Sequence, residues 1–313
     1  MKLENGILWC DATTNAVTGC DKVSPGCKNC YAEAGTRARV LRSQGKETWG
    51  PRGLREPVNF EPVFRRLDKL CICDRCHETY PVEWLKQKVA EDNHDRLARC
   101  GACGGSLRRI RLFADSNSDW LDPKWPVETL AKFLDAIRLA PNVDIQILTK
   151  RIELFYDRME EVLVTTTEEL QRWVQKWMDG QVVPSNVWLG VSVEDQKRAD
   201  ERIPLLLTTP AAVRFLSVEP LLDEITFHSR PCIPSEGGFT AVNEWLEKID
   251  WVIVGAESGA KRRDCGVAAI VDVIQQCQRA NIPVYVKQDC AFMPGQQWRI
   301  PDELWARKEF PRL

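Results

Sequence analysis

Three cysteines near the N-terminus have a spacing that suits an iron–sulfur cluster. Cys20, Cys27 and Cys30 form a C-x6-C-x2-C pattern in the segment GCDKVSPGCKNCY, between the first predicted strand and an Ala- and Arg-rich helix. Structural zinc takes four protein ligands, whereas three thiolates on a [4Fe-4S] cluster leave one iron open to a substrate or cofactor. The pattern therefore predicts these three residues as cluster ligands. A zinc site completed by Cys10 or Cys290 is the alternative interpretation.

Four further cysteines form two C-x2-C pairs, which is the pattern of a zinc ribbon. Cys73 and Cys76 make the first pair, and Cys100 and Cys103 make the second. Four thiolates close a tetrahedral Zn²⁺ site, and the metal can fold a segment too small and polar to bury a core of its own. We therefore expect a structural zinc ion here. A second iron–sulfur cluster is the alternative, and two neighbouring residues could substitute for a ligand: Cys71 and His77.

Composition restricts the class of protein further. The 313 residues are 44% apolar, so the chain can bury a full core, and the formal charge of −2 leaves any nucleic-acid contact to a local patch. The odd count of thirteen cysteines, the C-x2-C pairs and the lack of a signal peptide favour metal thiolates in a reducing compartment. No apolar run is long enough to span a bilayer. We therefore expect a cytoplasmic protein with no membrane partner.

Short apolar runs rich in β-branched and aromatic residues alternate with amphipathic helical patterns along the chain. One helical face, for example, carries Leu130, Phe133, Leu134 and Ile137. Buried strands that alternate with helices indicate an α/β fold with a parallel sheet, and seven strands suit a full or partial (β/α) barrel. A doubly wound sheet is the alternative. The predicted strands lie at residues 7–11, 110–116, 145–150, 187–194, 213–219, 251–257 and 282–288.

One charged, cysteine-rich segment interrupts this alternation and contains no clear βα unit. We therefore predict three regions along the chain. Residues 1–54 begin the barrel and carry the three-cysteine loop, residues 55–107 form a zinc-ribbon insertion, and residues 108–313 complete the barrel.

Polar residues follow the predicted strands at the point where each strand ends. The carboxyl ends of parallel strands meet at one face of a barrel, where barrel enzymes build their active sites. Two lysines facing several carboxylates there could bind a polar cofactor or substrate. Each group could equally be a strand-end cap or part of an ion pair. The residues are Asp115, Ser116, Asn117, Lys150, Ser192, Glu194, Glu219, Glu257, Lys287 and Gln288.

Several segments carry a resemblance to a known family. WCDATTNAVTGCDKVSPGCKNCYAE is followed, in order, by LFADSNSDW, ILTKR, WLGVSVEDQ, FLSVEPLL, WVIVGAESG and VKQ. Together they resemble a three-cysteine-motif family encoded by phages and mobile elements, of uncertain function and related to radical S-adenosylmethionine (SAM) enzymes in the neighbourhood of spore photoproduct lyase. The cysteine spacing departs from the common C-x3-C-x2-C signature of those enzymes, because the first gap is longer and Asn29 precedes Cys30.

This resemblance implies a radical SAM enzyme. The open iron of its cluster would bind the amino and carboxylate groups of SAM, and an electron donor would drive cleavage of SAM to a 5′-deoxyadenosyl radical. VIVGAE (252–257) resembles the strand that contacts adenine in these enzymes, with Gly255 allowing close approach of the cofactor and Glu257 at its end. The other implied contacts are Asp115, Ser116 and Asn117 for the amino group, Ser192 or Glu194 for the ribose, and Lys150 with Arg151 for a carboxylate or phosphate.

We therefore expect an iron–sulfur enzyme that cleaves SAM and acts on a nucleic acid or a nucleotide-derived substrate. Phage encoding and the relation to DNA-repair lyases favour DNA or RNA as a partner, and a protein encoded nearby is another expected partner. The competing interpretation is a non-redox protein with two zinc ions that docks nucleic acid or a protein through its ribbon. A third is a barrel that keeps the cluster as a sensor. The expected phosphate contacts are Lys22, Lys28, Arg37, Arg39 and Arg42.

Overall fold

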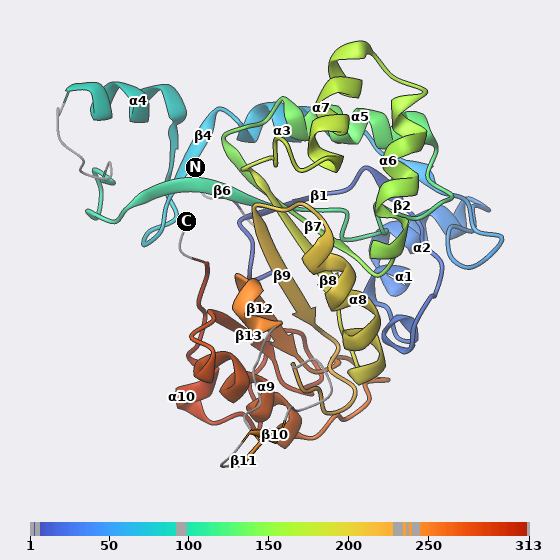
Figure 1. The fold of residues 1–313 in the computed structure, drawn as a ribbon, viewed down its shortest axis with the longest axis vertical. Coiled ribbons are helices and arrows are strands. Elements are labelled where there is room, and N and C mark those ends of the chain that lie inside the picture. Colours follow the sequence, from blue (N-terminus) through green and yellow to red (C-terminus); the bar gives the residue numbers. More distant parts are fainter. Residues whose placement is uncertain are drawn as a thin grey trace.

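The computed structural model describes residues 3, 7–91, 99–227, 234–235, 238–239 and 245–311. A nine-stranded sheet forms the centre of the fold (Figure 1). Two of its strands are antiparallel additions beside the first half of β6, namely β4 (Leu70–Cys73) and β5 (Thr79–Pro81). The other seven strands are parallel and follow one another in chain order: β1 (Ala12–Thr14), β6 (Leu107–Ala114), β7 (Val143–Thr149), β8 (Val187–Ser192), β9 (Val213–Val218), β12 (Trp251–Gly255) and β13 (Val284–Gln288).

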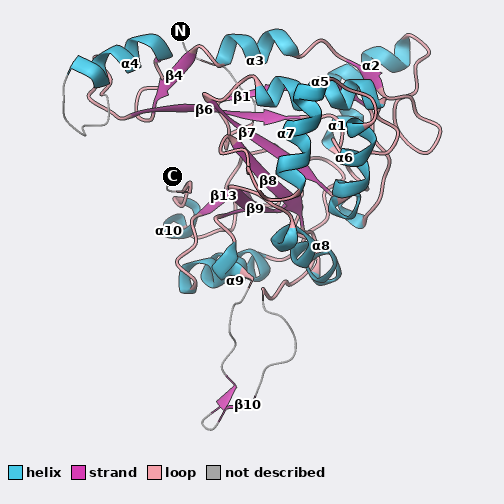
Figure 2. Ribbon diagram, turned by 45° about the horizontal axis from the view of Figure 1, so that its top comes forward, coloured by secondary structure: helices cyan, strands magenta, loops and turns pink. Residues whose placement is uncertain are grey.

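Helices pack against one face of the parallel strands and enclose the main core (Figure 2). The predicted helical face of Leu130, Phe133, Leu134 and Ile137 is confirmed, because all four side chains are fully buried. None of the described helices is long and apolar enough to cross a membrane. The helices are α1 (Tyr31–Ala34), α2 (Thr36–Ser43), α3 (Glu61–Leu67), α4 (Val82–Glu91), α5 (Val127–Arg138), α6 (Phe155–Leu163), α7 (Glu168–Met178), α8 (Gln196–Thr208), α9 (Val267–Arg279) and α10 (Asp302–Trp305).

Short elements lie between these helices and strands. The 3-10 turns of the described residues are η1 (Pro25–Cys27), η2 (Ile152–Leu154) and η3 (Leu246–Lys248). Two small antiparallel pairs lie outside the main sheet, and they join β2 (Val17–Thr18) to β3 (Glu56–Pro57) and β10 (Pro234–Ser235) to β11 (Gly238–Phe239).

Six of the seven predicted parallel strands are confirmed to within a few residues, but the first was placed too early. Residues 7–11 form a turn, in which the N–H of Cys10 donates to the carbonyl of Ile7, and β1 starts only at Ala12. The apolar run before β1 is buried for a different reason. Trp9 in this run packs against Phe113 of β6, with ring centroids 4.5 Å apart.

The second face of the parallel strands carries a separate aromatic cluster. Trp251 of β12 lies within it, with ring centroids 6.0 Å from Trp9 and 5.8 Å from Trp188 of β8. Tyr285 of β13 donates a hydrogen bond from its hydroxyl to the carbonyl of Leu8, 3.0 Å away. The two ends of the parallel run therefore approach each other across this face.

The contact between Tyr285 and Leu8 does not close the sheet into a barrel. Among the described strands, no pairing joins β1 to β13. The predicted barrel is therefore confirmed only as an α/β fold with a large, mostly parallel sheet, and the closed form of the barrel is not detected.

The predicted insertion at residues 55–107 combines two environments. Its start belongs to the main core, because Phe64 of α3 packs edge-to-face on Phe133 of α5 with centroids 6.1 Å apart. Its later part forms the β4–β5 hairpin and the cysteine pairs, with a small cluster of its own around Val82 and Leu107. The regional boundaries at residues 54 and 107 stay predictions.

Candidate metal centres and the pocket between the strand ends

The four cysteines of the ribbon form a compact group. The Sγ atoms of Cys73 and Cys103 lie 3.5 Å apart, as do those of Cys76 and Cys100, and all four lie within 4.8 Å of one another. Zn–S bonds of about 2.3 Å in a tetrahedron place sulfur atoms roughly 3.8 Å apart. The group can therefore hold one metal ion.

Neighbouring groups of the hairpin hold these thiols in place. The hydroxyl of Tyr80 lies 3.1 Å from Cys100 Sγ, and the N–H of Arg75 donates to Cys73 Sγ over 3.4 Å. The two proposed substitute ligands do not join the group. Cys71 is buried and donates to the carbonyl of Tyr80, and His77 is exposed on the turn.

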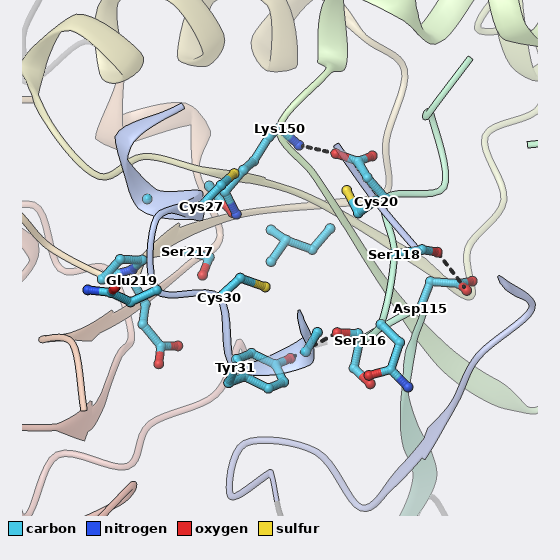
Figure 3. A pocket seen from close by; sticks show the side chains of 18 of the residues that line it. Cys20, Cys27, Cys30, Tyr31, Asp115, Ser116, Ser118, Lys150, Ser217 and Glu219 are labelled. Carbon is cyan, nitrogen blue, oxygen red and sulfur yellow. Dashed lines mark hydrogen bonds between the residues drawn. The ribbon is translucent and has the colours of Figure 1, made fainter. Parts of the chain in front are cut away.

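The other predicted cysteines converge on a pocket at the carboxyl ends of the parallel strands. Cys20 follows β2, Cys27 ends η1 and Cys30 directly precedes α1. Figure 3 shows the three side chains around this pocket, with Cys27 and Cys30 across from Cys20, together with Lys150, which follows β7, and Glu219, which follows β9. The pocket has a volume of about 450 Å³, within the range of small-molecule sites.

The donor set of this pocket differs from that of the ribbon. Among the described residues, no second group of three ligand atoms lies as close together as the ribbon group. Cys10 and Cys290, the fourth ligands considered for zinc, do not line the pocket, and their thiols donate to the carbonyls of Ile7 and Arg263 instead. Cys20, Cys27 and Cys30 therefore line one open space without forming a compact group of the kind seen in the ribbon.

Two buried glutamates predicted to bind cofactor contact the cysteine loop. Glu194 accepts a hydrogen bond from the N–H of Gly26 (3.3 Å) and pairs with Arg202 (2.9 Å). A Cβ on Gly26 would stand 3.1 Å from the Glu194 carboxylate, so the loop lies directly on this side chain. Burial opposes ionisation, but the charges of Arg202 and Lys150 keep the pKa of Glu194 below its usual value.

Glu257 anchors the same loop from β12. Its Oε2 accepts hydrogen bonds from the Asn29 side chain (2.9 Å) and the N–H of Arg263 (2.8 Å). The Arg263 guanidinium also donates to the carbonyl of Pro25, 3.0 Å away. Burial again opposes ionisation, but these donors hold the pKa of Glu257 below its usual value. Glu257 lines the pocket, whereas Glu194 does not.

The predicted trio after β6 lines the pocket. Asp115 has a left-handed backbone (φ 65°), and its Oδ1 accepts from the N–H groups of Ala16 (2.8 Å) and Val17 (3.3 Å). Its Oδ2 is buried without a partner in the described structure, and burial raises the pKa of Asp115 to about 7. The backbone carbonyls of Ser116 and Asn117 contact the N-terminal segment, since they accept hydrogen bonds from the Tyr31 hydroxyl and the N–H of Gly19.

Further polar groups complete the lining. Lys150 donates to Ser192 Oγ over 3.0 Å, and Lys287 forms an ion pair with Glu219. Gly255, predicted to approach the cofactor, does not line the pocket. A Cβ there would stand 3.1 Å from Gln288 Cγ, so the absence of a side chain serves the packing of β12 on β13.

A buried ionic network below Cys20 was not predicted from the sequence. Arg151 pairs with Asp119 (3.0 Å) and Asp122 (3.7 Å), and Arg55 pairs with Asp122 (2.7 Å). Arg151 was expected to hold a cofactor carboxylate or a phosphate; it lines the pocket, with 4% of its surface exposed. The sequence signal was the presence of Asp119 and Asp122 in the segment that follows β6.

The fold and these sites define an α/β protein with a mostly parallel sheet, a four-cysteine group that can hold a metal ion, and a cysteine-lined pocket. The chain belongs to the family described as Protein of unknown function (DUF5131), whose model matches residues 4–308. Neither the curated proteins nor the solved structures contain a significant match to it.

Proposed function

We propose that this protein is an iron–sulfur enzyme of the radical SAM type that acts on a nucleic acid or a nucleotide-derived substrate. The observation that carries the proposal is the convergence of Cys20, Cys27 and Cys30 on one pocket at the carboxyl ends of seven parallel strands. Active sites of α/β proteins with parallel strands are built at this end. We propose that the sheet is a partial barrel of the kind these enzymes use.

The residues of the chain have distinct tasks in this proposal. The three thiolates would hold a [4Fe-4S] cluster, which supplies the electron for cleavage of SAM when both are bound. Lys150 at the end of β7 offers a cation for the carboxylate of SAM. The orphan Oδ2 of Asp115 offers an acceptor in the pocket wall. Apolar lining groups exclude water from the pocket, and they include Trp9, Phe113 and Leu148.

Exposed cations near the cysteine loop support a polyanionic substrate. Lys28 lies on the loop itself, and Arg37 and Arg39 are exposed on α2. Two other expected phosphate contacts already have carboxylate partners, since Lys22 pairs with Glu33 and Arg42 with Glu47. We therefore propose DNA or RNA as the substrate, an electron donor as a necessary partner, and a protein encoded nearby as a further partner.

The test uses anaerobically reconstituted protein with SAM and dithionite, and chromatography measures the 5′-deoxyadenosine that is released. We expect release by the wild type and by Cys265→Ala, a matched control whose half-buried cysteine lies outside both sites. Cys27→Ala should abolish the release while the zinc content stays unchanged. A wild-type protein that carries iron and sulfide but releases no 5′-deoxyadenosine would refute the proposed enzymatic activity and favour a role as a sensor.

The second candidate is a non-redox zinc protein that docks nucleic acid or a partner through its ribbon. The observation in its favour is the preformed group of Cys73, Cys76, Cys100 and Cys103. A wild-type protein purified and reconstituted without oxygen that binds only zinc would favour this candidate.

A further inference from the structure

One of the three pocket cysteines differs from the others in its surroundings. Cys20 Sγ accepts a hydrogen bond from Nη1 of Arg151 over 3.6 Å, and Nη2 of Arg151 donates to the carbonyl of Asp21 over 3.3 Å. Cys27 Sγ lies 3.7 Å from the hydroxyl of Ser24, a neutral group. In the part of the chain that the structure describes, no other pocket cysteine receives a hydrogen bond from a cation.

The position of the Arg151 guanidinium is fixed by its ion pairs. Asp119 and Asp122 bind it from the loop after β6, and Asp119 is itself held by the Thr149 hydroxyl (2.7 Å) and the N–H of Lys150 (2.9 Å). Both carboxylates are almost fully buried. Moving the guanidinium away from Cys20 would therefore leave buried charges without partners, which is costly.

The surroundings of Cys20 explain why a cation is needed there. The guanidinium that donates to Cys20 Sγ also pairs with the almost fully buried carboxylates of Asp119 and Asp122. A metal ligand must be a thiolate, because coordination removes the proton. A thiolate so close to two carboxylates needs a compensating positive group, and Arg151 supplies it.

We propose that Arg151 is a positioning residue that holds Cys20 as a cluster ligand and raises the reduction potential of the cluster through its hydrogen bond to this sulfur. The inference rests on the proposed iron–sulfur function. The physical reason is that the reduced cluster carries one more negative charge, and a cationic donor to a ligand sulfur stabilises the reduced state more than the oxidised state.

The experiment is a redox titration of the reconstituted full-length protein, in which the electron paramagnetic resonance signal of the reduced cluster is measured at each potential. Replacing Arg151 with Gln should make reduction roughly tenfold less favourable, which is a shift of about 59 mV to lower potential for one electron. Arg151→Lys should recover part of this shift, because it keeps the charge but loses the planar fork.

Arg55→Gln is the matched control. Arg55 shares Asp122 with Arg151 and is also buried, but its partners among the described residues are carboxylates and backbone carbonyls and include no cysteine. We expect it to lower thermal stability without moving the potential. If Arg151→Gln assembles no cluster, Arg151→Lys is titrated in its place, and a potential below the wild-type value supports the inference.

Three outcomes would contradict the inference. They are a wild-type potential in Arg151→Gln, an equal shift in Arg55→Gln, and, where only Arg151→Lys assembles, a wild-type potential in that variant. A wild-type protein that takes up no iron at all would instead refute the proposed function, so the two failures are distinguishable.

Discussion

The two cysteine sites of this chain are built in opposite ways. The ribbon thiols are brought together by one hairpin and two short turns, and they stand within 4.8 Å of one another. The cysteine loop of the pocket is held by long-range contacts, since Glu194 after β8, Glu257 after β12 and Arg151 after β7 all reach it. The ribbon is therefore a local structure, whereas the pocket site depends on the whole sheet.

This contrast has a functional consequence. A closed tetrahedral site leaves no position for substrate and suits a structural metal. Three thiols beside a pocket of about 450 Å³ leave room for a further ligand. The two sites should therefore respond to different substitutions, and the following changes test whether they are independent.

The largest effect is expected from Cys100→Ala, which removes one ribbon ligand. Structural zinc contributes about 10–16 kcal/mol of apparent binding free energy in small zinc domains, so its loss should unfold the hairpin. Limited proteolysis should then cut the ribbon while the main sheet stays resistant, and metal analysis should show loss of zinc. Cys71→Ala is the control, because Cys71 lies outside the group, and it should keep its zinc. Equal zinc content in the two variants would disprove the assignment.

A second change breaks the pocket site and spares the ribbon. Asp119→Ala removes the carboxylate that pairs with Arg151. This carboxylate also accepts a hydrogen bond from the N–H of Lys150, at the start of the segment after β7. Removing one member of a buried ion pair typically costs about 3–5 kcal/mol, and urea unfolding should show a loss of this size. Asp135→Ala on α5 serves as control, because this partly exposed carboxylate pairs only with Arg138 of its own helix among the described ion pairs, and it should cost under about 0.5 kcal/mol. Loss of zinc from Asp119→Ala would show that the two sites are not independent.

Asp115 predicts a pH dependence specific to the pocket region. Burial raises its pKa from 3.8 to about 7, so the folded state binds the proton more tightly than the unfolded state. The contribution of this group to stability therefore falls as pH rises from about 4 to about 7 and is constant above that range.

The variant Asp115→Asn lacks this dependence. The difference in free energy of unfolding, variant minus wild type, should therefore increase as pH rises, by up to about 4 kcal/mol between about pH 4 and about pH 7. Chemical denaturation at a series of pH values measures the difference. A difference that does not change with pH would show that Asp115 titrates normally.

The smallest effect is expected at the outer shell of the ribbon. Tyr80→Phe removes the hydroxyl next to Cys100 Sγ and leaves all four thiols in place. Loss of such a partner typically lowers metal affinity about 10-fold or more without loss of the fold. Competition with a chromogenic chelator measures this change. Unchanged affinity would mean that the ribbon depends on its four thiols alone.

Much of the fold was predictable from local patterns in the sequence. Six parallel strands and their order follow from apolar runs that alternate with amphipathic helices. The ribbon ligands follow from their C-x2-C spacing, because both partners of a pair sit on the same turn. The first strand was misplaced because Trp9 is buried against aromatic rings across the sheet and not within a strand.

The roles of the pocket residues were less accessible. The rule that strand ends converge placed Asp115, Lys150 and Glu257 at one pocket, but it did not show that Glu257 binds the loop of Asn29. The partnership of Arg55 with Asp122 joins residues far apart in the chain, and no local pattern indicates it. Such contacts depend on how the sheet is assembled, which spacing alone does not determine.

The most direct test of this account is quantitation of iron, acid-labile sulfide and zinc in the wild type and in Cys27→Ala, both purified and reconstituted without oxygen. We predict one zinc with four irons and four sulfides per wild-type chain, and retention of the zinc with loss of iron and sulfide in Cys27→Ala. Two zinc ions and no iron in the wild type would contradict the account, because both cysteine sites would then be redox-inactive.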